Sequence, residues 1–338
     1  MNGMYKPEGA LLNTPQNRDY LSSPAGLERA MNSGATLEGI VTLCDSRLRL
    51  HVDLGCAVGI IEPQEALFCR AGEERKDIAI ITRVGKPVAF RITALELRDG
   101  VLTASLSRRL AQEECVRHHL SLRVPGDILR AKVTHLEPFG AFLDVGCGIS
   151  SLLSVDCISV SRISHPRDRL RPGMELPVVI KSIDRDTGRI YVSLRELLGT
   201  WEENAAAFEV GQTVSGIIRS VESYGVFVEL APNLAGLAEP REGFAEDLRT
   251  RIGKSAAVYI KSIVPARMKI KLLLIDSFCS EPPSQRLRYY VNIDSFCSEP
   301  PSQRLRYYVN TDTVSHLSHW IYSPIGSRKV VETVFDEE

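Results

Sequence analysis

One short pattern occurs twice in this chain, and it constrains the fold more than any other feature. An aromatic residue, a glycine, a small residue and a second aromatic residue follow one another at 139–142 and again at 224–227. An alternating, strand-like run precedes each copy, and matching residues on both sides keep a similar spacing. Similarity at a domain-sized period indicates repeated modules, and a period of two indicates that these modules are built from strands.

Each copy of the pattern is expected to place two aromatic rings close together on a curved sheet. Residues i and i+3 of a strand share a face only across a bulge or bend, which a glycine after the first ring can supply. Phe139 and Phe142 should therefore lie side by side, and so should Tyr224 and Phe227. Exposed paired rings on a small barrel suit stacking of bases, which is worth roughly 1–3 kcal/mol per base. The alternative is that one ring of each pair belongs to the barrel core.

Residues around the ring pairs extend this pattern into one that resembles a known family. The segments resemble the RNA-binding OB-fold domain named after small-subunit ribosomal protein S-one, with its leading Gly, its Phe-Gly-Ala-Phe and its closing Asp, Arg-Ile and Ser-Leu. Around the first ring pair, the matching positions are Gly126, 139–142, Asp184, 189–190 and 193–194. The resemblance covers roughly residues 36–276 and implies a short, three-barrel member of that family.

The resemblance implies an all-β fold of tandem OB-fold five-stranded barrels, with short helical connectors. The expected segments are an N-terminal extension at 1–35, a degenerate OB-fold domain at 36–109, a helical connector at 110–122, a second domain at 123–196, a second connector at 197–207, a third domain at 208–276 and a tail at 277–338. The first domain is degenerate because Leu48 and His51 stand where stacking rings would be. We expect it to be structural or to contact another protein.

The C-terminal tail contains an exact tandem duplication. Residues 275–292 recur without change as residues 293–310. The barrel copies have diverged heavily, so an unchanged copy indicates a recent duplication or an artefact. One copy can fill the native place while the other loops out, and the sequence leaves open which copy does so.

Composition favours neither a membrane nor a strongly charged partner. The chain is 44% hydrophobic and 25% charged, and its formal net charge is −1. Because attraction to phosphates should then be modest, stacking must carry more of any RNA binding. The sequence contains no apolar run of membrane-spanning length and no signal-peptide core, so we expect a cytoplasmic protein without membrane contact.

The sequence predicts no catalysis, no metal and no cofactor. The eight cysteines form no C-x-x-C pair, and the histidines at 118–119 and at 316 and 319 lack a carboxylate or cysteine at ligand spacing. A Walker-type loop, G-x-S-x-G and H-E-x-x-H are also absent from the sequence. We therefore predict a binding protein and not an enzyme.

Charged residues near the rings complete the candidate RNA-binding set. Beside the two ring pairs, this set comprises Lys132, Lys181, Asp184 and Arg189 in the second domain and Arg219, Lys261 and Lys269 in the third. A solvated charge is the alternative for each cation, and a turn cap is the alternative for Asp184. The family's histidine on this face is replaced by Ser154 and Glu239, and Glu239 would repel phosphate.

The sequence as a whole predicts binding of single-stranded RNA, in particular mRNA. The resemblance implies a link to translation as a ribosomal protein S-one-like factor, with the small ribosomal subunit as a candidate partner. Two alternatives remain open at this point: a non-ribosomal RNA-binding regulatory adaptor, and a protein–protein scaffold with weak RNA affinity.

Overall fold

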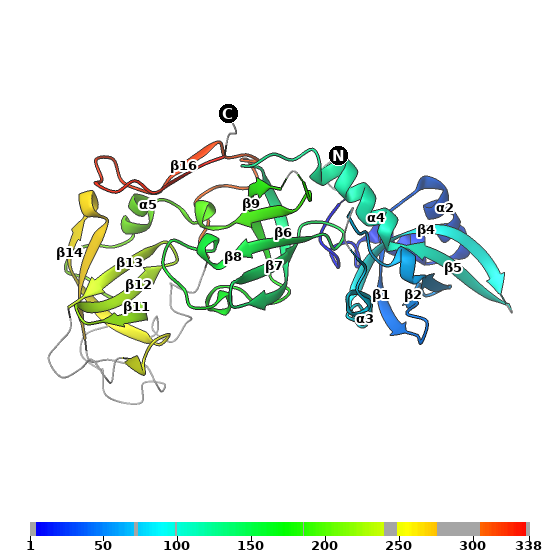
Figure 1. The fold of residues 1–338 in the computed structure, drawn as a ribbon, viewed down its shortest axis with the longest axis horizontal. Helices are drawn as coiled ribbons and strands as arrows, with labels where there is room; N and C mark the ends of the chain where they lie inside the picture. The colour runs from blue at the N-terminus through cyan, green and yellow to red at the C-terminus, as the bar shows by residue number, and fades with distance from the viewer. Residues whose placement is uncertain are drawn as a thin grey trace.

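The computed structural model describes residues 5–70, 74–98, 100–184, 186–239, 249–275 and 305–335. Within these residues the chain forms three closed barrels that follow one another in a row (Figure 1). Every barrel has five strands in the spatial order first, second, third, fifth, fourth, and the third strand pairs with the fifth in parallel. This arrangement is the Greek-key barrel of the OB-fold, so the predicted fold class is confirmed.

Fifteen strands build the barrels. The first barrel contains β1 (Leu37–Cys44), β2 (Leu50–Asp53), β3 (Val58–Ile61), β4 (Pro87–Arg98) and β5 (Val101–Ser107). The second contains β6 (Ile128–Glu137), β7 (Gly140–Asp144), β8 (Ser150–Ser154), β9 (Glu175–Ile183) and β10 (Ile190–Ser193). The third contains β11 (Thr213–Glu222), β12 (Gly225–Ala231), β13 (Leu234–Ala238), β14 (Ser255–Val264) and β15 (Lys269–Leu274).

Short helices and turns flank and connect the barrels. They are α1 (Pro15–Leu21), α2 (Pro24–Ser33), η1 (Pro63–Glu65), α3 (Asp77–Ile81), α4 (Arg108–Cys115), η2 (Val116–Leu120), η3 (Val155–Cys157), η4 (Pro166–Asp168), η5 (Arg195–Leu198), α5 (Trp201–Ala205) and η6 (Pro265–Arg267). The tail adds the strand pair β16 (His319–Ile321) and β17 (Glu332–Val334). Ser23 caps α2, because its hydroxyl accepts a hydrogen bond from the Gly26 N–H.

The glycine inside each ring pattern has a different role from the predicted bend. Phe139 lies in the turn between β6 and β7, and Gly140 is the first residue of β7. A Cβ at Gly140 would lie 2.5 Å from the carbonyl oxygen of Leu153, so the glycine allows β8 to approach closely. The irregularity lies instead in β6, whose pairing with β7 shifts between Val133 and His135.

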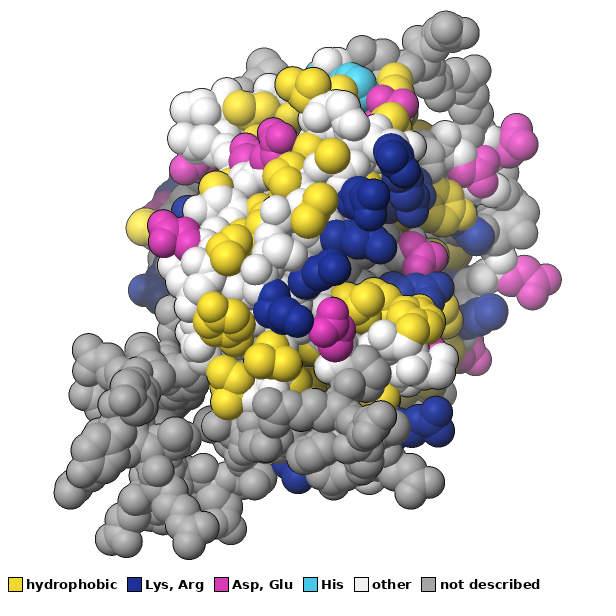
Figure 2. Space-filling model, turned by 90° about the vertical axis from the view of Figure 1, so that its left-hand side faces the viewer, with side chains coloured by type: hydrophobic (Ala, Val, Ile, Leu, Met, Phe, Trp, Pro, Cys, Tyr) yellow, Lys and Arg dark blue, Asp and Glu magenta, His cyan; other side chains and the backbone are white. Residues whose placement is uncertain are grey.

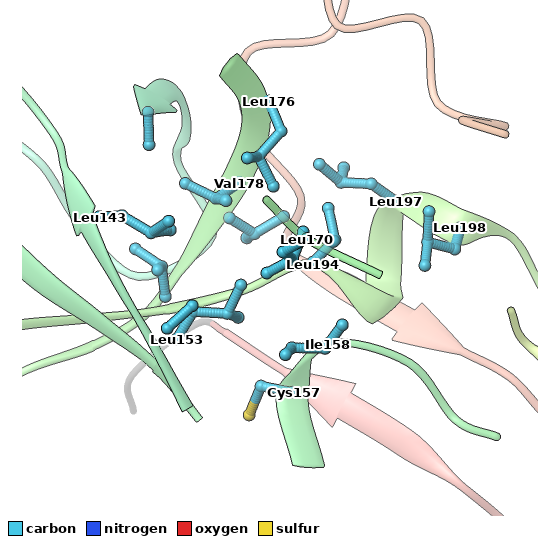
Figure 3. Packing of buried hydrophobic residues seen from close by; sticks show 14 of the residues in the cluster. Leu143, Leu153, Cys157, Ile158, Leu170, Leu176, Val178, Leu194, Leu197 and Leu198 are labelled. Carbon is cyan, nitrogen blue, oxygen red and sulfur yellow. The ribbon is translucent and has the colours of Figure 1, made fainter. Parts of the chain in front are cut away.

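One hydrophobic core runs through the second barrel, the following connector, the third barrel and the tail. Leu143, Leu153 and Val178 of the second barrel belong to the same buried cluster as Leu197 and Leu198 of the connector (Figure 3). Trp201 of this connector is also buried in the cluster, so it packs and does not offer a ring to RNA. The first barrel has a largely separate core of its own.

The N-terminal segment joins the first two barrels through one buried glutamate. The Glu8 carboxylate accepts hydrogen bonds from Arg108 at 2.7 and 3.0 Å and from the Ala89 backbone at 3.1 Å. The Glu8 N–H donates to Asp144 at 2.7 Å, and its carbonyl accepts from the Lys132 ammonium at 2.9 Å. Burial, with the Glu8 charge as a further cause, raises the pKa of Asp144 to about 7. The first and second barrels are therefore held together by a desolvated polar network.

The described part of the tail, residues 305–335, fastens the second barrel to the third (Figure 1). Its Leu317 N–H donates to the Gly126 carbonyl at the start of the second barrel, at 2.9 Å. The buried Tyr322 hydroxyl donates to the Asn233 carbonyl in the third barrel. Two barrels bound to one tail in this way should move as a unit.

The end of the second duplicated copy is part of this fold. The Tyr308 N–H donates to the Leu197 carbonyl at 3.0 Å, and Leu305, Tyr307 and Val309 pack against the shared core. Residues 276–304, which hold most of both copies, lie outside the described residues.

Deleting residues 293–310 should leave the fold and RNA binding intact. The deletion joins 292 to Thr311, and residues 287–292 have the same sequence as the packed residues 305–310. The remaining copy can therefore make the same contacts, while loop closure depends only weakly on loop length. We expect thermal denaturation to give an equal or slightly higher melting temperature. A large drop, or loss of soluble protein, would show that both copies are built into the structure.

Candidate nucleic-acid interface

A row of four side chains crosses the outer face of the second barrel. The strand register pairs His135 of β6 with Phe142 of β7, Phe142 with Leu152 of β8, and Leu152 with Tyr191 of β10. Directly paired residues on neighbouring strands share a face of the sheet. His135 is exposed and the other three are half-buried, so the row forms an accessible, mainly aromatic surface.

The rings of this row are already arranged as a stack. The His135 and Phe142 rings are parallel within 9°, with centroids 4.4 Å apart. Phe139 meets Phe142 edge-on, with centroids 6.0 Å apart and an interplanar angle of 87°. The Phe139 side chain is 56% exposed. Such a surface can accept a planar base on exposed ring faces and edges.

The third barrel carries the equivalent row with different chemistry. Its register aligns Ser220, Phe227, Leu237 and Lys271 across β11, β12, β13 and β15. Tyr224 is 64% exposed and meets Phe227 edge-on at 6.2 Å. The predicted ring pair is therefore present, but serine and lysine stand where the second barrel has histidine and tyrosine.

Three predicted charged residues of the second barrel lie around the strands of its row. Lys181 is exposed on β9 and its ammonium lies 3.3 Å from the Cys157 thiol. Asp184 caps the turn before β10, because its carboxylate accepts from the Thr187 hydroxyl and from backbone N–H groups. The Thr187 hydrogen bonds lower the pKa of Asp184. Arg189 is exposed and lines a cavity beside Phe142.

Two predicted cations, Arg219 and Lys132, are engaged in contacts within the protein. Arg219 is only 10% exposed and pairs with Glu229 at 2.6 Å and with Asp168 of the second barrel at 3.1 Å. Lys132 donates to the Glu8 carbonyl. Arg219 thus pairs with two carboxylates, and Lys132 donates to a backbone carbonyl of the N-terminal segment.

Cations also gather at the end of the molecule that the third barrel forms. Figure 2 shows Lys and Arg side chains in a row between apolar side chains on this face. Lys261, Lys269 and Lys271 are exposed on the adjacent strands β14 and β15. Lys261 pairs with the exposed Glu239 at 3.1 Å. Part of the positive charge expected on this barrel is therefore neutralised locally.

Sequence reasoning missed His135, Leu152 and Tyr191 as members of the second-barrel row. Their strands were expected, but the register between strands was not available from the alternating pattern alone. A signal was present for Tyr191, which occupies an outward position between buried neighbours. For His135 the alternation predicts the inward face, and the register shift between Val133 and His135 reverses it.

The structure adds two observations on other kinds of site. Within the described residues, no group of three or more His, Cys, Asp and Glu side chains is arranged to hold a metal ion. Among the same residues, no helix is long and apolar enough to cross a membrane.

Tandem OB-folds with exposed ring rows define a class of proteins suited to binding nucleic acid. Comparison with protein families assigns the second barrel to one kind of domain within this class. Residues 124–195 match the S1 RNA binding domain. A small ribosomal subunit protein bS1 homolog of Bacillus cereus is 27% identical over 202 residues, which cover 57% of this chain and 53% of that protein. The small ribosomal subunit protein bS1 of Rhizobium meliloti is 30% identical over 217 residues, covering 62% of this chain and 36% of that protein. The second barrel thus contains an S1 RNA binding domain, and the chain is similar to these bS1 proteins over two barrels or more.

This chain spans about half of the Bacillus relative and about a third of the Rhizobium relative. Among solved structures, a multidomain protein with nucleic acid binding domains from Streptococcus pneumoniae aligns over 76% of both chains. That alignment has 15% identity and a TM-score of 0.24.

Proposed function

We propose that this protein binds single-stranded RNA, and specifically mRNA, on the outer faces of its second and third barrels. The observation that carries the proposal is the row of His135, Phe142, Leu152 and Tyr191, with Phe139 beside it, on a barrel that matches an RNA binding domain. An exposed aromatic patch of this kind marks an interaction site. The second barrel is therefore the main site and the third barrel is a weaker one.

Binding on this face combines stacking with a limited number of phosphate contacts. A base stacks on the exposed ring of Phe139 or on the His135–Phe142 pair, while Lys181 and Arg189 attract the backbone. The near-neutral net charge of −1 makes stacking the larger contribution. No step of this function requires a catalytic group or a cofactor.

A link to translation is part of the proposal. The relatives that match over two barrels or more are named as small ribosomal subunit proteins, which supports the small subunit as a partner in the cytoplasm. Co-sedimentation with purified small subunits tests this link separately from RNA binding. RNA binding without co-sedimentation would favour the non-ribosomal regulatory adaptor.

A second candidate is favoured by the surface of the first barrel. Ile40, Leu43 and Val58 on β1 and β3 are 44%, 52% and 40% exposed, and this barrel has no ring pair. Apolar side chains in such positions suit contact with another protein. The scaffold function would be supported if the full-length chain did not bind RNA but still bound protein partners.

We expect the protein to bind single-stranded RNA much more tightly than a duplex of the same length. The rings on the second barrel need unstacked bases, which a duplex does not offer. Competition of unlabelled single strand and duplex against a fluorescent single strand, at two salt concentrations, measures the difference. Equal affinity for both forms would contradict stacking as the source of binding.

A further inference from the structure

A cavity of about 520 Å³ lies where the first barrel meets the aromatic row of the second. Phe142, Leu152, Arg189 and Tyr191 line it from the second barrel. Its opposite wall belongs to the first barrel, whose segment 66–70 follows η1 and contributes Leu67, Phe68 and Arg70. The volume is within the usual range for sites that bind small organic groups.

The segment 66–70 is held in this position by specific hydrogen bonds. The Phe68 N–H donates to the Gln112 side chain at 2.9 Å, and Gln112 donates to the Cys147 carbonyl of the second barrel at 3.0 Å. Arg70 donates to the Gly188 carbonyl at 3.0 Å, in the turn that precedes β10. A wall fixed at both ends keeps its shape when a ligand enters, which lowers the cost of binding.

The residues that face the cavity suit one chemical class of ligand. Phe68, Phe142 and Tyr191 offer rings, Arg70 and Arg189 offer guanidinium groups, and no Asp or Glu is among the described lining residues. Rings bind bases by stacking, and a guanidinium binds phosphate through a planar fork of donors.

At the junction between the second and third barrels, a segment of the preceding barrel again lines a cavity beside an aromatic pair. The segment after η3 of the second barrel, which contains Arg162 and Ile163, lines a cavity of about 770 Å³ together with Tyr224 and Phe227 of the third barrel. Both η1 and η3 follow the third strand of their barrel. Asp156 and Glu222 also line this second cavity, which makes it less suited to phosphate than the first.

We propose that segment 66–70 of the first barrel forms one wall of the RNA site on the second barrel, and that Arg70 binds a phosphate of the strand stacked on Phe142. The inference rests on the proposed function, because it assigns a further contact to the same bound RNA. It gives the first barrel, which has no ring pair, a direct part in RNA binding. The RNA site is then composite, built from two successive barrels.

The test compares Arg70→Gln with Arg29→Gln in the full chain. Arg29 lies on α2 of the same N-terminal half, is 56% exposed and pairs with Asp19, so it is a matched control for the loss of one charge. The probe is a fluorescent oligouridylate of about 12 nucleotides, within the usual footprint of an OB-fold. Binding is titrated at several salt concentrations, and the melting temperature of each variant is recorded.

We expect Arg70→Gln to weaken binding about threefold to tenfold at low salt. It should also reduce the slope of log affinity against log salt by roughly 0.7, the value for one phosphate of a single strand. Arg70→Lys should keep the slope, because the charge remains. Arg29→Gln should match the wild type in both readouts. A purely structural role of Arg70 would change affinity and melting temperature without changing the slope.

Two outcomes overturn the inference in distinguishable ways. In the first outcome, Phe142→Ala weakens binding, but Arg70→Gln and Arg29→Gln give the same slope of log affinity against log salt. The first barrel is then not part of the site, while the RNA face of the second barrel is retained. If the wild type does not bind the oligouridylate, or Phe142→Ala leaves its binding unchanged, the proposed RNA face and the composite site both fail.

Discussion

Replacing Phe139 and Phe142 together by alanine should weaken binding of single-stranded RNA by roughly 2–6 kcal/mol, since two base stacks are lost. Phe142 also supports the parallel His135 ring, so its loss disturbs a third ring of the face. The Phe142 side chain is only half-buried and lies outside the barrel core, so the variant should stay folded. Titration of a fluorescent single strand measures the change.

The matched control is the alanine replacement of Tyr224 and Phe227 in the third barrel. These rings have the same edge-on geometry, but Ser220 stands where the second barrel has His135, and the exposed Glu239 repels phosphate. We therefore expect a smaller loss from this pair. If the third-barrel variant binds RNA more weakly than the second-barrel variant while both remain folded, the ranking of the two sites is wrong.

The fold could be predicted because it depends on a pattern that repeats along the chain. An OB-fold barrel is indicated by the alternating strands, the domain-sized period and the resemblance around Phe139 and Phe142. The OB-fold has one strand order, which all three barrels show. The pairing of the two rings in the second and third barrels follows from the same pattern. Local signals were weaker at the N-terminus, which the sequence predicts only as an extension and which forms α1, capped by Thr14, and α2.

The candidate site could be predicted only in part, because its geometry depends on contacts between distant segments. The bulge in β11 places Arg219 beside Asp168 and Glu229, and no local pattern reports that a loop of the preceding barrel supplies an acid there. Lys132 meets a carbonyl that is 124 residues away in sequence. The stacked His135 was missed for the same reason, since its partner is defined by strand register.

The ion cluster between the second and third barrels involves unusually buried charges. The side chains of Arg169 and Glu229 are both 0% exposed, and Arg219 joins them from β11 at 10% exposure. Buried charges are expensive to transfer from water, and their attraction compensates for this cost only while all partners are present. The cluster should therefore be sensitive to the loss of one member.

Replacing Glu229 by glutamine should lower the free energy of unfolding of the second and third barrels by about 3 kcal/mol or more, because two buried guanidinium groups lose their shared carboxylate. Trp201 and Trp320, the two tryptophans of the chain, are buried in the core that these barrels share, so their fluorescence during denaturant unfolding follows this unit.

The matched control is Glu239→Gln, which removes an exposed ion pair with Lys261 and should change stability by only about 0.5 kcal/mol. Equal unfolding midpoints for the two variants would show that the buried cluster adds no stability. A lower midpoint for Glu229→Gln alone would show that the buried cluster stabilises the unit formed by the second and third barrels.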